Sequence, residues 1–135
     1  MDTYIVDGLR SPIGIKNGQL IGMRPDDLAS DVVKGLLERN NTINHKNIED
    51  IVIGCAFPEG PQGMLMARGI SIMAGIPKEA GAKVVNRLCG SSMDATHQVS
   101  QAIASEDIDC GISGGTEDMF GVPMGGYMPS FNPVL

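Results

Sequence analysis

The sequence predicts an α/β fold, a layered parallel or mixed sheet with helices on both faces. Short apolar runs alternate along the chain with segments in which apolar residues recur every three or four positions. The first pattern is typical of strands, and the second is typical of amphipathic helices. Strands that alternate with helices pair in parallel through right-handed crossovers, which places the helices on the faces of the sheet.

The first half of the chain predicts two strands with one helix between them. Residues 4–6 form a short apolar run and predict the first strand, and the glycine-containing segment 11–18 predicts a loop. A helix is expected to begin at Pro25, because proline fits the first turn and the two aspartates that follow favour the positive end of the helix dipole. It should end at Asn40. Residues 51–54, apolar throughout, predict a strand covered on both faces.

The second half continues the alternation. Apolar residues from Met66 to Ala74 predict a helix that stops at a glycine and a proline. A third strand is expected at 84–85, a third helix follows with its apolar stripe at Met93, Thr96, Val99 and Ile103, and a fourth strand is expected at 108–113. From Met119 onward no period is visible, which predicts an irregular segment, either an ordered loop or a linker.

Composition excludes several classes of protein. The chain has 135 residues and a net charge of −6, and its ten basic residues are scattered, which argues against a nucleic-acid partner. No segment approaches the roughly 20 apolar residues of a membrane span, and the N-terminus has no signal-peptide pattern. Cysteines stand at 55, 89 and 110, an odd number without Cys-x-x-Cys spacing. We therefore expect reduced thiols in a cytoplasmic protein, with neither disulfides nor a metal site.

Cys89 is the candidate catalytic residue. It follows an apolar strand and immediately precedes the Gly-Ser-Ser start of an amphipathic helix. Unpaired N–H groups and the helix dipole at such a position favour the thiolate, which is the nucleophilic form. Ser91, with Asp94 three residues later, could cap this helix as an imperfect capping box. The local pattern leaves two interpretations open: a nucleophile, or a small buried residue at a tight turn.

The other candidate groups carry weaker signals. His97 lies on the same helix as Cys89 but roughly 12 Å further along its axis, and His45 lies in a polar loop that predicts a surface position. The sequence therefore offers no clear base for the thiol. Cys55 and Cys110 are expected to pack as small apolar residues.

Two further segments have alternative interpretations. Residues 114–118, Gly-Gly-Thr-Glu-Asp, could form an anion-binding nest, but a tight strand exit is the simpler interpretation beside two acidic residues. Arg10 could hold a phosphate, although an ion pair with a nearby carboxylate is the simpler interpretation.

The segment 85–92, VNRLCGSS, closely resembles the active-cysteine signature of thiolases. Further segments resemble that family in the family's order: IVDGLRSPIG at 5–14, DIVIGC at 50–55, the helix 67–77 and GGTEDM at 114–119. Within the family, CGSSM at 89–93 and the later Gly-Val-Pro-Met are most similar to degradative 3-ketoacyl-CoA thiolases, in particular the β-subunit of bacterial fatty-acid oxidation complexes.

The resemblance implies a function and a division of the chain. Cys89 would attack the keto carbon of a 3-ketoacyl-CoA, acetyl-CoA would leave, and a second CoA would collect the acyl group, with no cofactor or metal besides these thioester substrates. The histidine and second cysteine of the family belong to its C-terminal half, so the chain alone is expected to be inactive. Residues 1–118 would be an N-terminal α/β domain lacking its last strand, and 119–135 the start of a loop domain.

The resemblance also implies partners. An open sheet edge and an uncovered face predict a homo-oligomer. A multifunctional fatty-acid oxidation α-subunit is a further possible partner. Two alternatives from other classes remain: an inactive dimerising or binding module, and a redox-active thiol protein, which a helix-capped cysteine permits.

Overall fold

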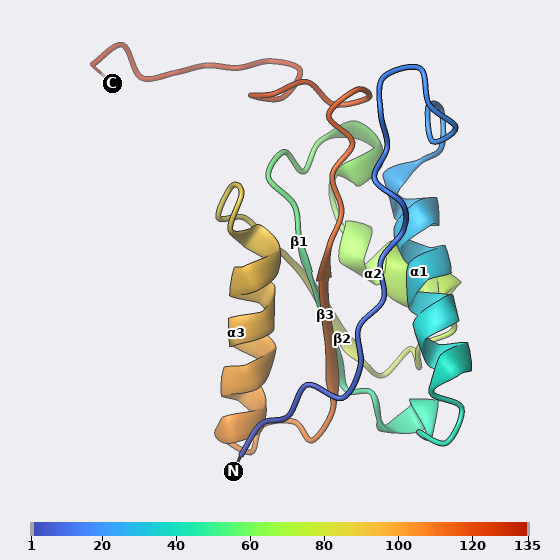
Figure 1. Cartoon of the computed structure of the whole chain (residues 1–135). Helices are drawn as coiled ribbons and strands as arrows, with labels where there is room; N and C mark the ends of the chain where they lie inside the picture. Colours follow the sequence, from blue (N-terminus) through green and yellow to red (C-terminus); the bar gives the residue numbers. More distant parts are fainter. Residues whose placement is uncertain (1, 135) are drawn as a thin grey trace.

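The computed structural model describes residues 2–134 and is built on a three-stranded parallel sheet (Figure 1). Strand β1 (Asp50–Gly54) is central, with β2 (Gly81–Val85) on one side and β3 (Gly111–Gly115) on the other. The three strands are level, because Gly54, the last residue of β1, lies opposite both Val85 and Gly115. All three carboxyl ends therefore meet at one edge of the sheet, at the top of Figure 1.

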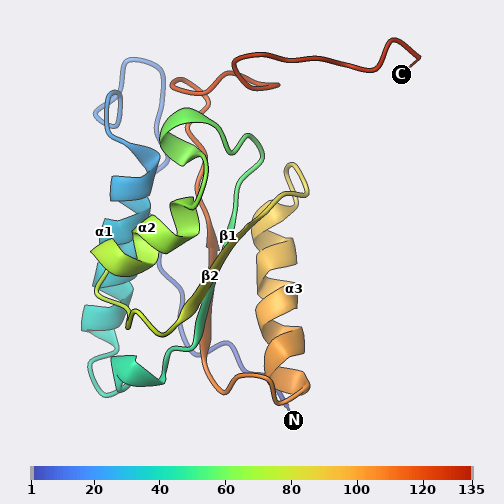
Figure 2. The ribbon, with the colours of Figure 1, turned by 180° about the vertical axis from the view of Figure 1, so that it is seen from behind.

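Helices cover both faces of the sheet, as the sequence predicts. Helices α1 (Pro25–Arg39) and α2 (Met66–Met73) lie on one face and α3 (Ser91–Ala104) on the other, which Figure 2 shows from behind. Two short 3-10 helices, η1 (His45–Asn47) and η2 (Gly60–Gln62), lie in the connections. The start of α1 is as expected, since Pro25 occupies the first turn together with two aspartates.

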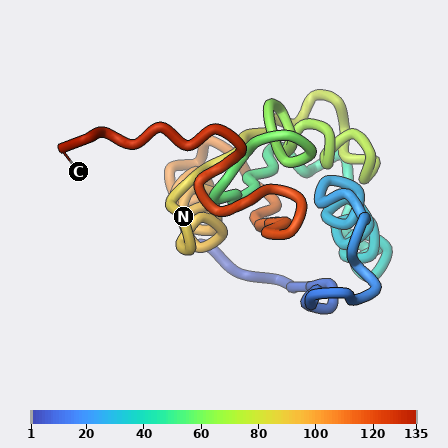
Figure 3. The backbone as a smooth tube through the Cα atoms, turned by 90° about the horizontal axis from the view of Figure 1, so that it is seen from above, coloured from blue at the N-terminus to red at the C-terminus, as the bar shows by residue number. Residues whose placement is uncertain are grey.

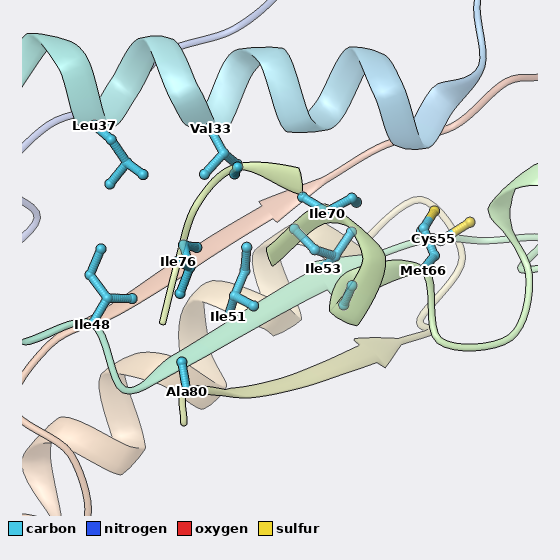
Figure 4. Close-up of a cluster of buried hydrophobic side chains, with 12 residues drawn as sticks. Val33, Leu37, Ile48, Ile51, Ile53, Cys55, Met66, Ile70, Ile76 and Ala80 are labelled. Atoms are coloured by element: carbon cyan, nitrogen blue, oxygen red, sulfur yellow. The ribbon is translucent and has the colours of Figure 1, made fainter. Parts of the chain in front are cut away.

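The core explains why the central strand is apolar throughout. Ile51 and Ile53 point into a cluster with side chains of α1 and α2, while Val52 packs on the opposite face against Ala95 and Val99 of α3. Figure 4 shows the larger cluster, which includes Val33, Leu37, Ile48, Met66, Ile70, Ile76 and Ala80. Full burial of one such side chain contributes about 1.5–3 kcal/mol. The prediction for 51–54 is confirmed.

The predicted first strand is wrong. Residues 4–6 run extended on the open side of β3 but pair with no strand of the described chain, and Tyr4, Ile5 and Val6 are 77%, 84% and 76% exposed. A cavity of about 530 Å³ separates this segment from β3. An apolar run becomes a strand only when an open edge lies within hydrogen-bonding distance of it, and here the cavity intervenes.

Side chains hold the N-terminal segment in place without the sheet. Thr3 Oγ1 donates to the carbonyl oxygen of Ser100 on α3 at 3.1 Å. Asp7 accepts two hydrogen bonds from Arg39, at 2.6 and 2.8 Å, and one from Asn40 at 2.7 Å. These bonds lower the pKa of Asp7 to about 2. The segment is thus pinned at both ends, to α3 and to the end of α1.

Other boundaries shift by a few residues. The third and fourth predicted strands lie at 81–85 and 111–115, because pairing with β1 sets their limits. Beyond Met119 the chain is irregular, as predicted, and its end extends away from the body, as Figure 3 shows from above. Within residues 2–134, none of the helices has the length and apolarity needed to span a bilayer.

Candidate nucleophile site at the carboxyl edge of the sheet

Cys89 lies at the carboxyl edge of the sheet, in the turn between β2 and α3. Helix α3 begins at Ser91 with Gly90 as its N-cap, so Cys89 directly precedes the cap. Its side chain is exposed and lines a cavity of about 420 Å³. The alternative in which Cys89 is a small buried residue is therefore wrong, and the thiol is accessible to a ligand in the cavity.

The turn that carries Cys89 is held by the side chains beside it. Leu88 has a φ of 48°, in the left-handed region that a leucine rarely adopts. Asn86 Oδ1 accepts the N–H of Leu88 at 2.9 Å. Ser91 Oγ accepts the N–H of Arg87 at 2.8 Å and donates to the carbonyl of Leu88 at 2.6 Å. Both ends of the turn are therefore fixed by hydrogen bonds.

The predicted capping box is wrong. Ser91 bonds back into the turn, so its oxygen does not cap α3, and Gly90 occupies the cap position without a side-chain bond. Asp94 does not reach back to the cap either, because it pairs with Arg87 at 2.8 Å and accepts from Gln98 at 2.8 Å. The bond from Arg87, followed by that from Gln98, lowers the pKa of Asp94.

Two glycines allow the start of α3 to lie against the strand ends. A Cβ at Gly54 would clash with the backbone of Ser91 and Ser92, and a Cβ at Gly115 would lie 2.8 Å from the Cβ of Ser92. A Cβ cannot lie this close to the start of α3, so only glycine at these two positions permits the close approach. The close approach brings the turn that carries Cys89 against the ends of β1 and β3.

The carboxylate of Glu117, just after β3, is surrounded by hydrogen-bond donors. Its carboxylate accepts the N–H of Ala56 at 2.6 Å, the N–H of Phe57 at 3.2 Å and Nε2 of Gln62 at 2.6 Å. The alternative of an anion-binding nest at 114–118 is therefore not supported, because the carboxylate of Glu117 is itself the bound anion, held by backbone N–H groups of another loop. The simpler interpretation, a tight strand exit, agrees with the end of β3 at Gly115. Gln62 is fully buried and has partners for both amide atoms, a role that its position in a polar loop did not reveal.

Neither of the other two cysteines is exposed as Cys89 is, although Cys55 also lines the Cys89 cavity. Cys55 is buried, and burial followed by the charge of Glu117 raises its pKa to about 12. Cys110 precedes β3 at the opposite end of the sheet, and burial, followed by the charges of Glu49 and Asp109, raises its pKa. Both pack as partly or fully buried residues, as the sequence predicts. No group of His, Cys, Asp or Glu among residues 2–134 is arranged to hold a metal ion.

Neither His45 nor His97 lines the Cys89 cavity. His45 is in η1 and its Nε2 lies 3.3 Å from the carbonyl oxygen of Leu37, while His97 lines the separate cavity beside the N-terminal segment. The titratable residues of the described chain that line the Cys89 cavity are Cys55, Cys89 and Glu117. Arg10 makes no ion pair in the part of the chain that the structure describes, because Asp7 pairs with Arg39.

The walls of the Cys89 cavity are mostly apolar. Phe57 comes from the loop after β1, Leu88 from the turn itself, and Met119 and Met124 from the irregular segment after β3. The thiol therefore faces a space that suits an apolar group. Ligands of open α/β sheets bind at the carboxyl ends of the strands, where this cavity lies.

Comparison with known proteins assigns the chain to a family. Residues 3–131 match the family model "Thiolase, N-terminal domain". A 3-ketoacyl-CoA thiolase of Aliivibrio salmonicida (strain LFI1238) is 49% identical over 124 residues, which cover 91% of this chain and 32% of that protein. A 3-ketoacyl-CoA thiolase of Shewanella sp. (strain W3-18-1) is 48% identical over 132 residues, covering 97% of this chain and 34% of that protein. The chain spans about a third of the length of these curated relatives. It belongs to the thiolase family, with the sequence and the α/β architecture of its N-terminal domain.

Proposed function

We propose that this chain supplies the nucleophilic cysteine of a 3-ketoacyl-CoA thiolase. One observation carries the proposal: the exposed side chain of Cys89 lines a mostly apolar cavity at the carboxyl edge of the sheet. Its sulfur would form a bond to the keto carbon of a 3-ketoacyl-CoA while the bond between that carbon and its α-carbon breaks. The proton of the thiol passes to a general base, and the α-carbon takes up a proton, so that its fragment leaves as acetyl-CoA. The thiol of a second CoA then displaces Cys89, and the released acyl-CoA and the restored thiol close the cycle.

We place the general base outside this chain. No histidine of residues 2–134 lines the Cys89 cavity, and the carboxylate of Glu117 is already engaged by four hydrogen bonds within the chain. The relatives are about three times as long as the chain, which leaves ample sequence to supply the base.

The division into an α/β domain at 1–118 and the start of a loop domain at 119–135 remains part of the proposal. It is supported by the end of β3 at Gly115 and the irregular path that follows. Two contacts dock that path onto the body: Asp118 N–H donates to Gln62 Oε1 at 2.9 Å, and Tyr127 N–H donates to Glu59 at 2.7 Å.

We also propose acyl-CoA as the substrate and self-association of the chain, with a fatty-acid oxidation α-subunit as a further partner. Self-association is supported by the outer edges of β2 and β3, which pair with no further strand of the described chain, and by exposed apolar side chains on α2 such as Ile72. The free thiols fit the reducing cytoplasm that we propose as its location.

The test measures acyl transfer and turnover separately. Purified chain is mixed with an activated aryl thioester, and the acyl adduct is located by peptide mass spectrometry, with Cys89→Ala as the control. We expect the adduct on Cys89 and no cleavage of acetoacetyl-CoA at an ordinary thiolase rate. An unmodified Cys89 would contradict its proposed role as a nucleophile and would favour a binding module. Reversible sulfenate formation with a functional output would favour a redox protein. Normal turnover would contradict the external base.

A further inference from the structure

We propose that Asn86 is a positioning residue for Cys89, and that it acts as the link between the nucleophile turn and the ends of the other two strands. The inference rests on the proposed function, because it concerns the same thiol. Three segments far apart in the sequence take part: the loop after β1, the turn after β2 and the residues after β3. They are joined by a continuous series of hydrogen bonds that ends one residue before Cys89.

The first link runs from β3 to the loop after β1. Glu117 binds the N–H groups of Ala56 and Phe57, at 2.6 and 3.2 Å. The buried amide of Gln62 donates to Glu117 at 2.6 Å and to the carbonyl oxygen of Phe57 at 2.8 Å. The loop is thus held from both its N–H and its carbonyl side, and the peptide group of Ala56 has a fixed orientation.

The second link runs from that loop to the nucleophile turn. Asn86 Nδ2 donates to the carbonyl oxygen of Ala56 at 2.8 Å. Its Oδ1 accepts the N–H of Leu88 at 2.9 Å. The side-chain amide of Asn86 therefore donates to the loop and accepts from the turn, so its orientation is fixed by both partners.

The third link is the backbone of Leu88. This residue is held at a φ of 48°, where leucine has no intrinsic preference, and such a conformation persists only when its surroundings determine it. The bond from the Leu88 N–H to Asn86 is one of the determinants. Others are the bonds of Ser91 Oγ to Arg87 and Leu88 and the backbone bond from the Ser91 N–H to the Leu88 carbonyl at 3.1 Å. The direction in which the next residue, Cys89, enters the cavity follows from this backbone conformation.

A positioning role differs from a purely structural role in what it affects. Alkylation by a small reagent such as iodoacetamide requires an accessible thiol and little more. Acyl transfer requires the sulfur to approach a carbonyl carbon along a defined direction in the cavity, and small misplacements cost rate. Loss of Asn86 should therefore slow acylation of Cys89 much more than its alkylation.

The experiment compares both reactions in the chain and in three variants. The acyl donor is phenyl thioacetate, whose thiophenolate leaves as the acetyl group joins Sγ, and the proton of the thiol passes to the buffer. Asn86→Ala removes both hydrogen bonds. Asn86→Asp keeps the acceptor for Leu88 and loses the donor to Ala56. The matched control is Asn44→Ala at the opposite end of the sheet. It removes the same kind of bond, in which Asn44 Oδ1 accepts the N–H of Lys46 at 3.1 Å.

We expect Asn86→Ala to lower the acylation rate about tenfold and the alkylation rate less than about twofold. Asn86→Asp should fall between Asn86→Ala and the unchanged chain, and Asn44→Ala should react as the unchanged chain does. Equal acylation rates in the chain and in Asn86→Ala would overturn the proposal. A parallel loss of both reactions together with the circular dichroism signal, in Asn86→Ala and Asn86→Asp alike, would also overturn it, because Asn86 would then be structural. If the unchanged chain accepts no acetyl group, it is the nucleophile proposal that fails.

Discussion

The carboxyl edge of the sheet and the open side of β3 show opposite relations between sequence and structure. At the carboxyl edge, side chains of Asn86 and Glu117 bond peptide groups of other segments and fix the turn that carries Cys89. On the open side of β3, residues 4–6 have a strand-like sequence but no strand within reach. The difference shows that a local pattern sets what a segment could form, whereas the neighbouring partners decide whether it forms.

The largest effect is expected from Gly54→Ala at the carboxyl edge. The added Cβ would clash with the backbone at the start of α3, and backbone atoms cannot move as a flexible side chain can. We expect the free energy of unfolding to fall by about 3 kcal/mol or more, measured by urea denaturation.

Gly69→Ala is the matched control for that substitution. Gly69 lies within α2, and an added Cβ there meets nothing within 4 Å. Alanine is the better helix former by about 1 kcal/mol, so this variant should be slightly more stable than the unchanged chain. Equal losses in the two variants would contradict the close approach of α3 to β1.

The second prediction compares two of the thiols, Cys89 and Cys55. Cys55 has a pKa of about 12, so only about one molecule in ten thousand carries its thiolate at about pH 8. We expect iodoacetamide to modify the exposed Cys89 at least about a hundred times faster than Cys55 in the folded chain. The rates are measured by peptide mass spectrometry, and urea should remove the difference. Comparable rates in the folded chain would mean that Cys55 is accessible.

The third prediction concerns the turn between β2 and α3 that carries Cys89. Leu88→Gly removes the strain of a left-handed leucine, about 1–2 kcal/mol, and adds the chain entropy of glycine to the unfolded state, about 0.4–1 kcal/mol. The net gain in the free energy of unfolding should be about 0.5 kcal/mol by urea denaturation. Leu65→Gly is the control, since Leu65 is also exposed but has a φ of −93°, and this variant should lose stability.

The smallest effect concerns the N-terminal segment and pH. The pKa of Asp7 is about 2 in the folded chain, below its ordinary value of 3.8, so the unfolded chain takes up this proton first. The bonds to Arg39 and Asn40 therefore contribute fully above about pH 4, and their contribution is lost as the pH falls toward about 2. The protection of the amides of residues 3–8 against hydrogen exchange, relative to the intrinsic exchange rate at each pH, should fall in this window and, in Asp7→Asn, at neutral pH as well. Protection that does not change with pH would contradict the role of Asp7 in holding this segment.

Much of the fold and the place of Cys89 follow from local patterns. The apolar run 51–54 and the helix that begins at Pro25 are visible in sequence, because burial and helix-terminal electrostatics depend on residue type. The position of Cys89 follows from the strand-to-helix order. The partners of Ser91 and Asp94 do not, since a serine before a helix can bond either to the helix or to the preceding turn, and the choice depends on tertiary geometry.

The buried network could not be predicted at all. Gln62 lies in a polar stretch with glycines and a proline, where a surface position is the natural expectation, and yet it is fully buried. Its burial requires Glu117, which lies 55 positions later, and no local pattern connects two such residues. The lack of a strand partner for residues 4–6 cannot be predicted from the sequence either, because it depends on a cavity beside β3.

The level ends of the three strands have an evolutionary consequence. The segments that begin at residues 55, 86 and 116 are encoded far apart, but they meet at one edge and share peptide-group contacts through Ala56, Asn86 and Glu117. A lineage that changes Asn86 or Glu117 leaves peptide groups of the loop after β1 without their partners, whereas any residue except proline at position 56 keeps the N–H and the carbonyl used there. Drift is therefore expected to be restricted at the codons for 86 and 117 and freer at the codon for 56.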